Sequence, residues 1–185
     1  EVPGVSPRSV IPTFAAMNVL IDNWRCSGVP FYLRSGKRLS KRKTEISIHF
    51  KSVPYLMFAK SMEELIEPSI LVFRIQPDEG ISLQIQAKKP GSLVCLDSVL
   101  MDFSYKKGIF LDAYEWVLLD CMLGDHLLFL REDAVESTWS LLTPVIEKIE
   151  STTEIEKISN YPAGSSCPVE AELLIEKDGR SWRPL

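Results

Sequence analysis

Histidine is scarce in this chain, and the residue spacings that mark metal and nucleotide sites are missing. Only two of the 185 residues are histidine, His49 and His126, and the four cysteines include no Cys-x-x-Cys pair. The nine glycines never come closer than eight positions, so the chain has no Gly-x-Gly-x-x-Gly sequence and no P-loop. These absences exclude a zinc knuckle and a dinucleotide-binding loop. We predict no catalytic residue and no metal ligand here, and we interpret both histidines as structural.

Long apolar runs and a strong net charge are missing as well. Fully apolar stretches such as residues 55–59 are far shorter than the roughly 20 residues that cross a bilayer, so we predict no membrane partner. A net charge of −4 argues against binding nucleic acid through the overall field of the protein. The scattered cysteines indicate reduced thiols rather than a disulfide framework, which is typical of a cytoplasmic protein.

The hydrophobic patterns predict strands and helices in separate blocks. A first helix is predicted from Thr13 to about residue 27, because Phe14, Met17, Ile21 and Trp24 recur at spacings of three and four. Strands are predicted at residues 31–33, 44–50, 69–76, 81–88 and 101–105. Further helices are predicted at residues 114–122, 133–149 and about 168–178. This order excludes the βαβ alternation of a doubly wound parallel sheet and predicts an α+β fold.

Two of these elements have specific end signals. Pro77-Asp78-Glu79-Gly80 is turn chemistry, which predicts a hairpin between the strands on either side of it. Asp133, with Glu136 three residues later, predicts a capping box at the start of the long helix. In the strand at 81–88 the polar residues Ser82, Gln84 and Gln86 alternate with apolar ones, so we expect a polar sheet face turned to solvent or to a partner.

Positive charge is concentrated between residues 34 and 43. Six of these ten residues are Lys or Arg and none is acidic, whereas the remainder of the chain has 15 basic and 25 acidic residues. Gly36 would allow close approach of the backbone, and converging Lys and Arg groups suit a phosphate or phosphosugar. A solvated surface loop explains the composition equally well. Nucleic acid is disfavoured because few aromatic residues are interleaved.

A second polar pair, Arg74 and Gln76, lies two residues apart on a predicted strand and therefore on one face. The two side chains could reach a polar ligand. Because a charge within an apolar run is costly unless it is paired, a buried ion pair or a dimer contact explains Arg74 about as well.

Eight segments in register resemble the glucose-6-phosphate dehydrogenase family, and together they extend over nearly the whole chain. They are Pro12–Ala16, Asp22–Arg25, Val29–Leu39, Arg74–Gly80, Met101–Tyr105, Asp112–Glu115, Tyr161–Ser165 and Pro168–Ala171. The resemblance is to the C-terminal part of the family. It implies that residues 1–185 form a single substrate-binding and dimerisation domain and that the N-terminal dinucleotide-binding domain is absent from this sequence. The implied fold is α+β, with a large, mainly antiparallel β-sheet backed by helices.

The resemblance also implies a function. The family oxidises glucose 6-phosphate to 6-phosphogluconolactone with reduction of NADP, the first step of the pentose phosphate pathway, in the cytoplasm. Lys37 and Arg42 match positions that contact glucose 6-phosphate, and Gln76 matches another position near the substrate. NADP is the implied cofactor, bound mainly by the absent domain, so we predict no cofactor-binding residue here and no activity for this chain alone. A homo-oligomer formed through the sheet is expected.

Some family members hold a second, structural NADP in this domain. Three basic residues match that site, Arg34, Lys43 and Arg74. Four other positions differ, with Ser47, Ser82, Gln84 and Ser166 where those members have Arg, Tyr, Lys and Arg. We therefore predict no structural NADP site. The alternative function is a non-catalytic oligomerisation module, in which the basic loop is only an exposed remnant.

Overall fold

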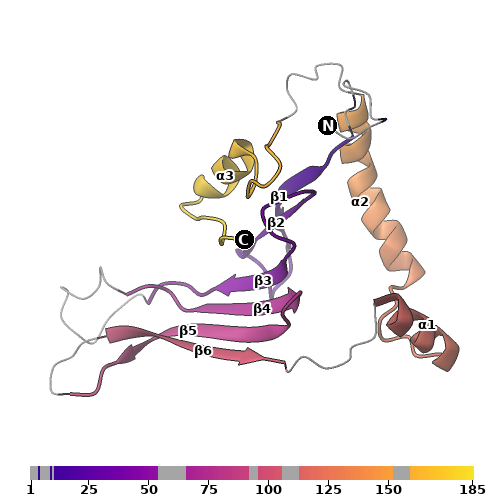
Figure 1. The fold of residues 1–185 in the computed structure, drawn as a ribbon. Helices are drawn as coiled ribbons and strands as arrows, with labels where there is room; N and C mark the ends of the chain where they lie inside the picture. The colour runs from indigo at the N-terminus through magenta and orange to yellow at the C-terminus, as the bar shows by residue number, and fades with distance from the viewer. Residues whose placement is uncertain are drawn as a thin grey trace. The chain divides into compact units, whose positions relative to one another are not determined.

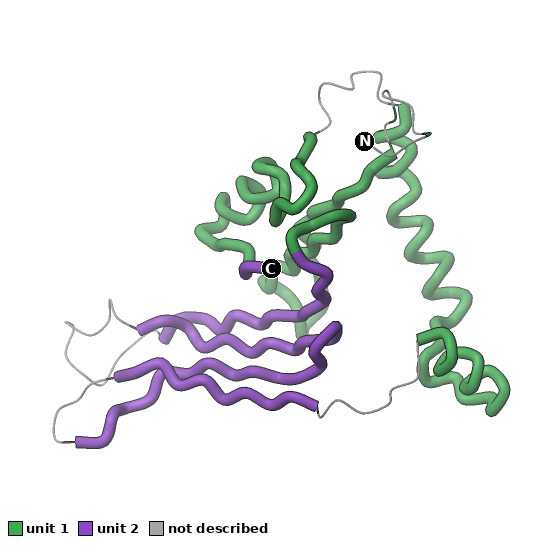
Figure 2. Tube along the Cα trace, in the orientation of Figure 1, with its two compact units in different colours: residues 1–40, 109–182 green, residues 41–108, 183–185 purple. Residues whose placement is uncertain are grey.

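The computed structural model describes residues 4, 9, 11–53, 66–91, 96–105, 113–151 and 159–185. Within these ranges the chain forms six strands followed by three helices (Figure 1). It divides into two compact units, which are coloured separately in Figure 2. Unit 1 consists of residues 1–40 and 109–182, and unit 2 consists of residues 41–108 and 183–185.

The first two strands form a hairpin in unit 1. Strand β1 (Phe14–Leu20) pairs antiparallel with β2 (Pro30–Gly36) along its whole length. The helix predicted from Thr13 is therefore wrong. Its four apolar residues fit a helical period, but cross-strand hydrogen bonds to β2 decide the conformation, as tertiary context often overrides local preference. Trp24, which the helix would have buried, is 89% exposed.

The four-stranded sheet of unit 2 is antiparallel throughout, in the order β3-β4-β5-β6. Its strands are β3 (Thr44–His49), β4 (Ile70–Gln76), β5 (Gly80–Lys88) and β6 (Leu96–Ser104). The hairpin predicted around Pro77-Asp78-Glu79 is confirmed by the pairing of β4 with β5. The predicted strand at 101–105 is the second half of β6.

One polar residue of β5 does not behave as its pattern predicts. Ser82, expected on a solvated face, is 6% exposed. It lies opposite Val72, which is 2% exposed, and its hydroxyl accepts a hydrogen bond from Arg74 at 3.3 Å. The hydrogen bond from Arg74 satisfies the Ser82 hydroxyl, which permits this serine to be buried.

Helix α1 (Ala113–Leu123) ends where expected, just before Gly124, which has a φ of 71°. Helix α2 (Glu132–Glu150) has Arg131 as its N-cap residue and no side-chain capping bond there, so the predicted capping box is wrong. The N-cap lies two residues before the predicted Asp133, which instead forms an ion pair with Arg131 at 3.0 Å.

Helix α3 (Val169–Glu176) packs against β1 in unit 1. Its contact side is buried at Ala171 and Ile175, with Cys167 just before the helix. The predicted α+β class with antiparallel strands is thus confirmed, with the described strands in sheets of two and four. Across the described residues, no helix has the length and apolar character needed to cross a membrane.

Candidate functional site

Lys37 directly follows β2, in a loop whose backbone is held at several points. Its N–H donates to the carbonyl of Thr13 at 2.8 Å. The next residue, Arg38, has a φ of 51°, a left-handed conformation that is uncommon outside glycine. A larger residue at Gly36 would require the Phe14 ring to shift, since an added Cβ would lie 2.5 Å from it. The backbone of Lys37 is therefore fixed, while its side chain is exposed.

Arg42 and Gln76 lie at one end of the four-stranded sheet. Thr44 at the start of β3 is opposite Gln76 at the end of β4, and Arg42 precedes β3 by two residues. The Gln76 amide donates to the Thr44 hydroxyl at 3.1 Å. Antiparallel pairing thus brings two of the three predicted substrate contacts, Arg42 and Gln76, to the same end of the unit 2 sheet. Lys37 belongs to unit 1.

Lys43, next to Arg42, is bound within unit 2. Its ammonium forms an ion pair with Glu45 at 2.8 Å, and Arg183 reaches the other Glu45 oxygen at 3.0 Å. The Glu45 side chain is only 15% exposed, so solvent screens this pair of contacts less than a surface ion pair.

Arg34, on β2, packs over an aromatic ring. Its guanidinium lies 5.0 Å from the ring centroid of Trp182, a cation–π distance. The Trp182 indole N–H donates to the Ala171 carbonyl at 2.7 Å, and the ring meets Tyr32 edge-on at 6.3 Å. This cluster anchors Trp182 to unit 1 and holds the Arg34 guanidinium against the protein.

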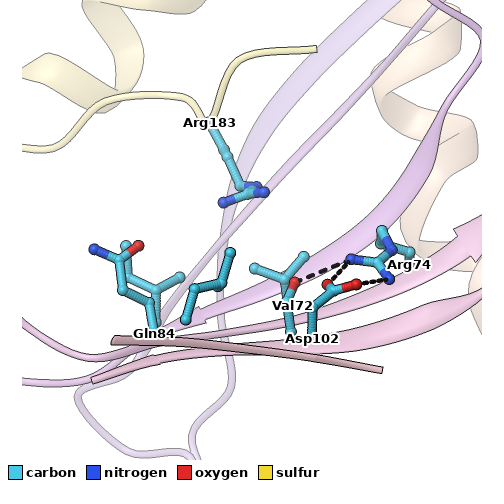
Figure 3. Close-up of a pocket in the computed structure, with 8 residues that line it drawn as sticks. Val72, Arg74, Gln84, Asp102 and Arg183 are labelled. Atoms are coloured by element: carbon cyan, nitrogen blue, oxygen red, sulfur yellow. Dashed lines mark hydrogen bonds and ion pairs between the residues drawn. The ribbon is translucent and has the colours of Figure 1, made fainter. Parts of the chain in front are cut away.

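Arg74 forms an ion pair and several further hydrogen bonds within the unit 2 sheet. Figure 3 shows its guanidinium beside Asp102, on a face of the unit 2 sheet that forms a pocket of about 260 Å³. The two groups form a bidentate pair at 2.5 and 3.2 Å, and Arg74 also donates to the Phe103 carbonyl and the Ser104 hydroxyl. Asp102 raises the pKa of Arg74, and Arg74 in turn lowers the pKa of Asp102. Of the explanations open for Arg74, the structure shows an intramolecular ion pair.

The basic residues therefore fall into two groups. Those that match a second NADP site, Arg34, Lys43 and Arg74, are bound to other residues of the chain. Lys37 and Arg42, like Arg38 and Lys41 of the same loop, have exposed side chains without an ion pair to any described residue. An exposed ammonium and guanidinium can meet an incoming phosphate without first breaking an existing contact.

The sequence did not predict the residues that hold the basic side chains and the Lys37 loop in place. Glu45 is an ordinary polar position in the alternating pattern of its strand. Nothing in the sequence therefore indicates that it forms ion pairs with both Lys43 and Arg183. Trp182 contacts Arg34, and Tyr161 bonds Lys37; each pair is more than a hundred positions apart in the sequence. A local sequence pattern does not predict such contacts. For Tyr161 the only signal was its place in a segment that resembles the family.

The described cysteines are free thiols, and the described residues form no metal-binding cluster. Cys26, Cys121 and Cys167 are free, and Cys95 lies outside the described residues. Burial raises the pKa of the Cys167 thiol, which keeps it protonated and unreactive at neutral pH. In the described ranges, no three His, Cys, Asp or Glu side chains gather in a way that could hold a metal ion.

Comparison with known proteins gives the family. The sequence model described as "Glucose-6-phosphate dehydrogenase, C-terminal domain" matches residues 1–183. The glucose-6-phosphate 1-dehydrogenase of Chlamydia pneumoniae is 47% identical over the whole chain, and that of Aggregatibacter actinomycetemcomitans is 43% identical over 99% of it. The chain spans 37% and 36% of the length of these two relatives.

Solved structures agree with the sequence comparison. The crystal structure of glucose-6-phosphate 1-dehydrogenase from Mycobacterium avium matches the whole chain with a TM-score of 0.81 and 37% identity, and 38% of that protein is covered. A glucose-6-phosphate dehydrogenase in complex with its substrate glucose-6-phosphate matches 97% of the chain with a TM-score of 0.83 and 33% identity, over 37% of its own length. This chain belongs to the glucose-6-phosphate dehydrogenase family, whose C-terminal domain model matches residues 1–183.

Proposed function

We propose that residues 1–185 act as one domain that supplies phosphosugar contacts to a cytoplasmic glucose-6-phosphate dehydrogenase. The intact enzyme would remove the proton of the C1 hydroxyl and a hydride from C1 itself of glucose 6-phosphate. The hydride reduces NADP, and the sugar leaves as 6-phosphogluconolactone. In this proposal Lys37, Arg42 and Gln76 hold the substrate, and their role is positional.

The observation that carries the proposal is the availability of Lys37 and Arg42 beside cations that are already bound. Lys43 and Arg74 have carboxylate partners at 2.8 and 2.5 Å, so using either for a ligand would break an existing ion pair. Lys37 and Arg42 are exposed in a loop with high positive charge, where a dianionic phosphate gains charge-assisted hydrogen bonds. A related protein with the same fold is known in complex with glucose-6-phosphate.

The residues of this chain do not fit NADP. The sequence has no glycine-rich phosphate loop, and the basic residues that match a second dinucleotide site are engaged with Trp182, Glu45 and Asp102. We therefore assign no step through NADP to these residues and propose that the cofactor binds residues outside this chain.

Steady-state kinetics test the substrate contacts. The assay uses a full-length subunit, meaning this chain joined to a dinucleotide-binding part of its family. Losing a charge-assisted hydrogen bond costs about 1.5–3 kcal/mol, so Lys37→Ala and Arg42→Ala should each raise KM for glucose 6-phosphate about 10- to 150-fold. If the contact is equally strong in ground and transition states, kcat stays the same.

Lys41→Ala is the matched control, because it removes one positive charge from the same exposed loop at a position that matches no substrate contact. It should change KM by less than about threefold, through long-range attraction alone. Equal effects of Lys37→Ala and Lys41→Ala would show that only the overall charge of the loop matters, and the proposed contact would then be wrong.

The isolated chain should have no dehydrogenase activity, since it contains neither a credible general base nor a nucleotide loop. Incubating it with glucose 6-phosphate and NADP and following NADPH absorbance would check this. Production of NADPH by the purified chain would contradict the division of labour proposed above.

A second candidate, self-association through the unit 2 sheet, is favoured by strand β6. Among the described strands, β6 forms one edge of the sheet, and its residues Leu100, Met101 and Phe103 are 64%, 49% and 54% exposed. Exposed apolar residues on an unpaired edge are typical of a surface that another chain covers. Sedimentation equilibrium at several concentrations should show a homo-oligomer, and a strictly monomeric chain would count against it.

A further inference from the structure

The loop that contains Lys37 is hydrogen-bonded to residues 161–165, a part of unit 1 that is distant in the sequence. The Gly164 N–H donates to the carbonyl of Arg38 at 2.8 Å, and the Ser40 N–H donates to the carbonyl of Ser165 at 2.9 Å. A third contact comes from the Tyr161 hydroxyl. Residues more than 120 positions away in the sequence thus bind this loop at three residues, Lys37, Arg38 and Ser40.

The Tyr161 hydroxyl lies where it can hold the backbone of Lys37 itself. Its oxygen is 2.8 Å from the Lys37 carbonyl, 3.0 Å from the Thr13 carbonyl and 3.2 Å from the Thr13 hydroxyl. A phenol has one proton to donate, and the Lys37 carbonyl is its shortest acceptor, while the Thr13 hydroxyl can donate to the phenol oxygen. The Tyr161 ring packs on Phe14 with centroids 5.5 Å apart, which fixes the direction of the hydroxyl.

The loop needs this support because of its backbone conformation. Arg38 has a φ of 51°, which a non-glycine residue adopts only where the surroundings determine it. The Lys37 side chain, exposed and without an ion pair among the described residues, receives no such support of its own. The main chain of Lys37 therefore sets where its side chain begins, and Tyr161 bonds that main chain directly.

We propose that Tyr161 is a positioning residue for substrate binding, acting through Lys37. The hydroxyl holds the Lys37 carbonyl, the carbonyl fixes the start of the lysine side chain, and the ammonium is thereby presented to the phosphosugar. This inference rests on the proposed function of Lys37. Tyr161 itself does not need to touch the substrate.

Tyr161→Phe in the full-length subunit is the direct test, because it removes the hydroxyl and keeps the ring that packs on Phe14. Loss of one hydrogen bond that aligns the loop should raise KM for glucose 6-phosphate roughly three- to tenfold and leave kcat within about twofold. Tyr32→Phe is the matched control. It removes a hydroxyl that donates to Asp178 elsewhere in unit 1, and it should leave KM unchanged.

A double variant separates positioning from a general structural effect. If Tyr161 acts through Lys37, Tyr161→Phe should change KM by less than about twofold when Lys37 is already alanine. An equal increase in KM in both backgrounds would overturn the proposal. If Lys37→Ala alone leaves KM unchanged, the proposed function of Lys37 fails instead, and the two failures are thus distinguishable.

Amide hydrogen exchange gives a second measurement that does not depend on activity. The Lys37 and Ser40 amides are hydrogen-bonded within this arrangement, so Tyr161→Phe should speed their exchange, while Tyr32→Phe should not. Unchanged protection of residues 37–40 in a folded Tyr161→Phe protein would show that the hydroxyl does not hold the loop, and would overturn the proposal.

Discussion

Replacing Gly80 by alanine should disrupt the unit 2 sheet, because a Cβ at this position has no space. Gly80 is buried at the start of β5, between Arg74 on β4 and Ser104 on β6. An added Cβ would lie far inside van der Waals contact of the Phe103 carbonyl oxygen and of the Arg74 guanidinium. The first of these neighbours is backbone and cannot rotate away, so β5 and β6 must separate locally.

The expected cost follows from three effects. Overpacking a filled site costs about 1–3 kcal/mol, and alanine recovers about 0.4–1 kcal/mol by restricting the unfolded chain. Separating the strands also weakens the adjoining hydrogen bond from the Tyr105 N–H to the Glu79 carbonyl, now 3.1 Å, which is worth about 0.5–1.5 kcal/mol. The free energy of unfolding should fall by about 2 kcal/mol, within a range of about 0.5–4 kcal/mol.

Gly36→Ala is the control. Its added Cβ would meet side chains only, the Phe14 ring at 2.5 Å and the Leu39 methyl groups at 3.2 Å, and these can shift where a backbone atom cannot. It should cost about 1 kcal/mol or less. Urea unfolding followed by far-UV circular dichroism compares the two variants. If Gly80→Ala is no more destabilising than Gly36→Ala, the packing described around Gly80 is wrong.

Three further predictions concern the core, one ion pair and the cofactor. Ile175→Ala, at a position 5% exposed on α3, should lower the free energy of unfolding by about 2–5 kcal/mol, and a loss well under 1 kcal/mol in urea denaturation would contradict its burial. Because Arg74 lowers the pKa of Asp102, the pair contributes stability above the ordinary carboxyl value of 3.8 and loses it as the pH falls through the lower folded value. Asp102→Asn should therefore be less stable than wild type near pH 7, and this difference should shrink as the pH falls below 3.8; a difference independent of pH in thermal unfolding would refute this. Titration of the isolated chain with NADP by calorimetry should show no saturable binding, whereas tight binding would mean that Arg74 and its neighbours exchange their partners for the dinucleotide.

The sequence predicts best where local signals and the fold agree. The hairpin around Pro77-Asp78-Glu79 and the helix that ends before Gly124 have strong turn and stop residues, and both were found. The segment Phe14–Leu20 fits both a helix and a strand, and only its pairing with residues 30–36 decides between them. The capping box failed because the N-cap residue is Arg131, two residues before the predicted Asp133.

For the site, the sequence predicts the types of residue but not their partners. The density of positive charge around Lys37 and Arg42 is visible without a structure. Which cations are already bound is not visible, since Arg74 and Asp102 are 28 positions apart and meet only through the register of three strands. The contact between Tyr161 and Lys37, across 124 positions, is of the same kind.

The most direct test of the account is phosphate selectivity in binding to the full-length subunit. Calorimetric titration with glucose 6-phosphate and with glucose gives a ratio of affinities that reports only the phosphate contact. We predict that the subunit prefers glucose 6-phosphate, that Lys37→Ala and Arg42→Ala each reduce this preference at least about tenfold, and that Lys41→Ala does not. A ratio that stays the same in Lys37→Ala and Arg42→Ala would contradict the claim that this chain holds the phosphosugar.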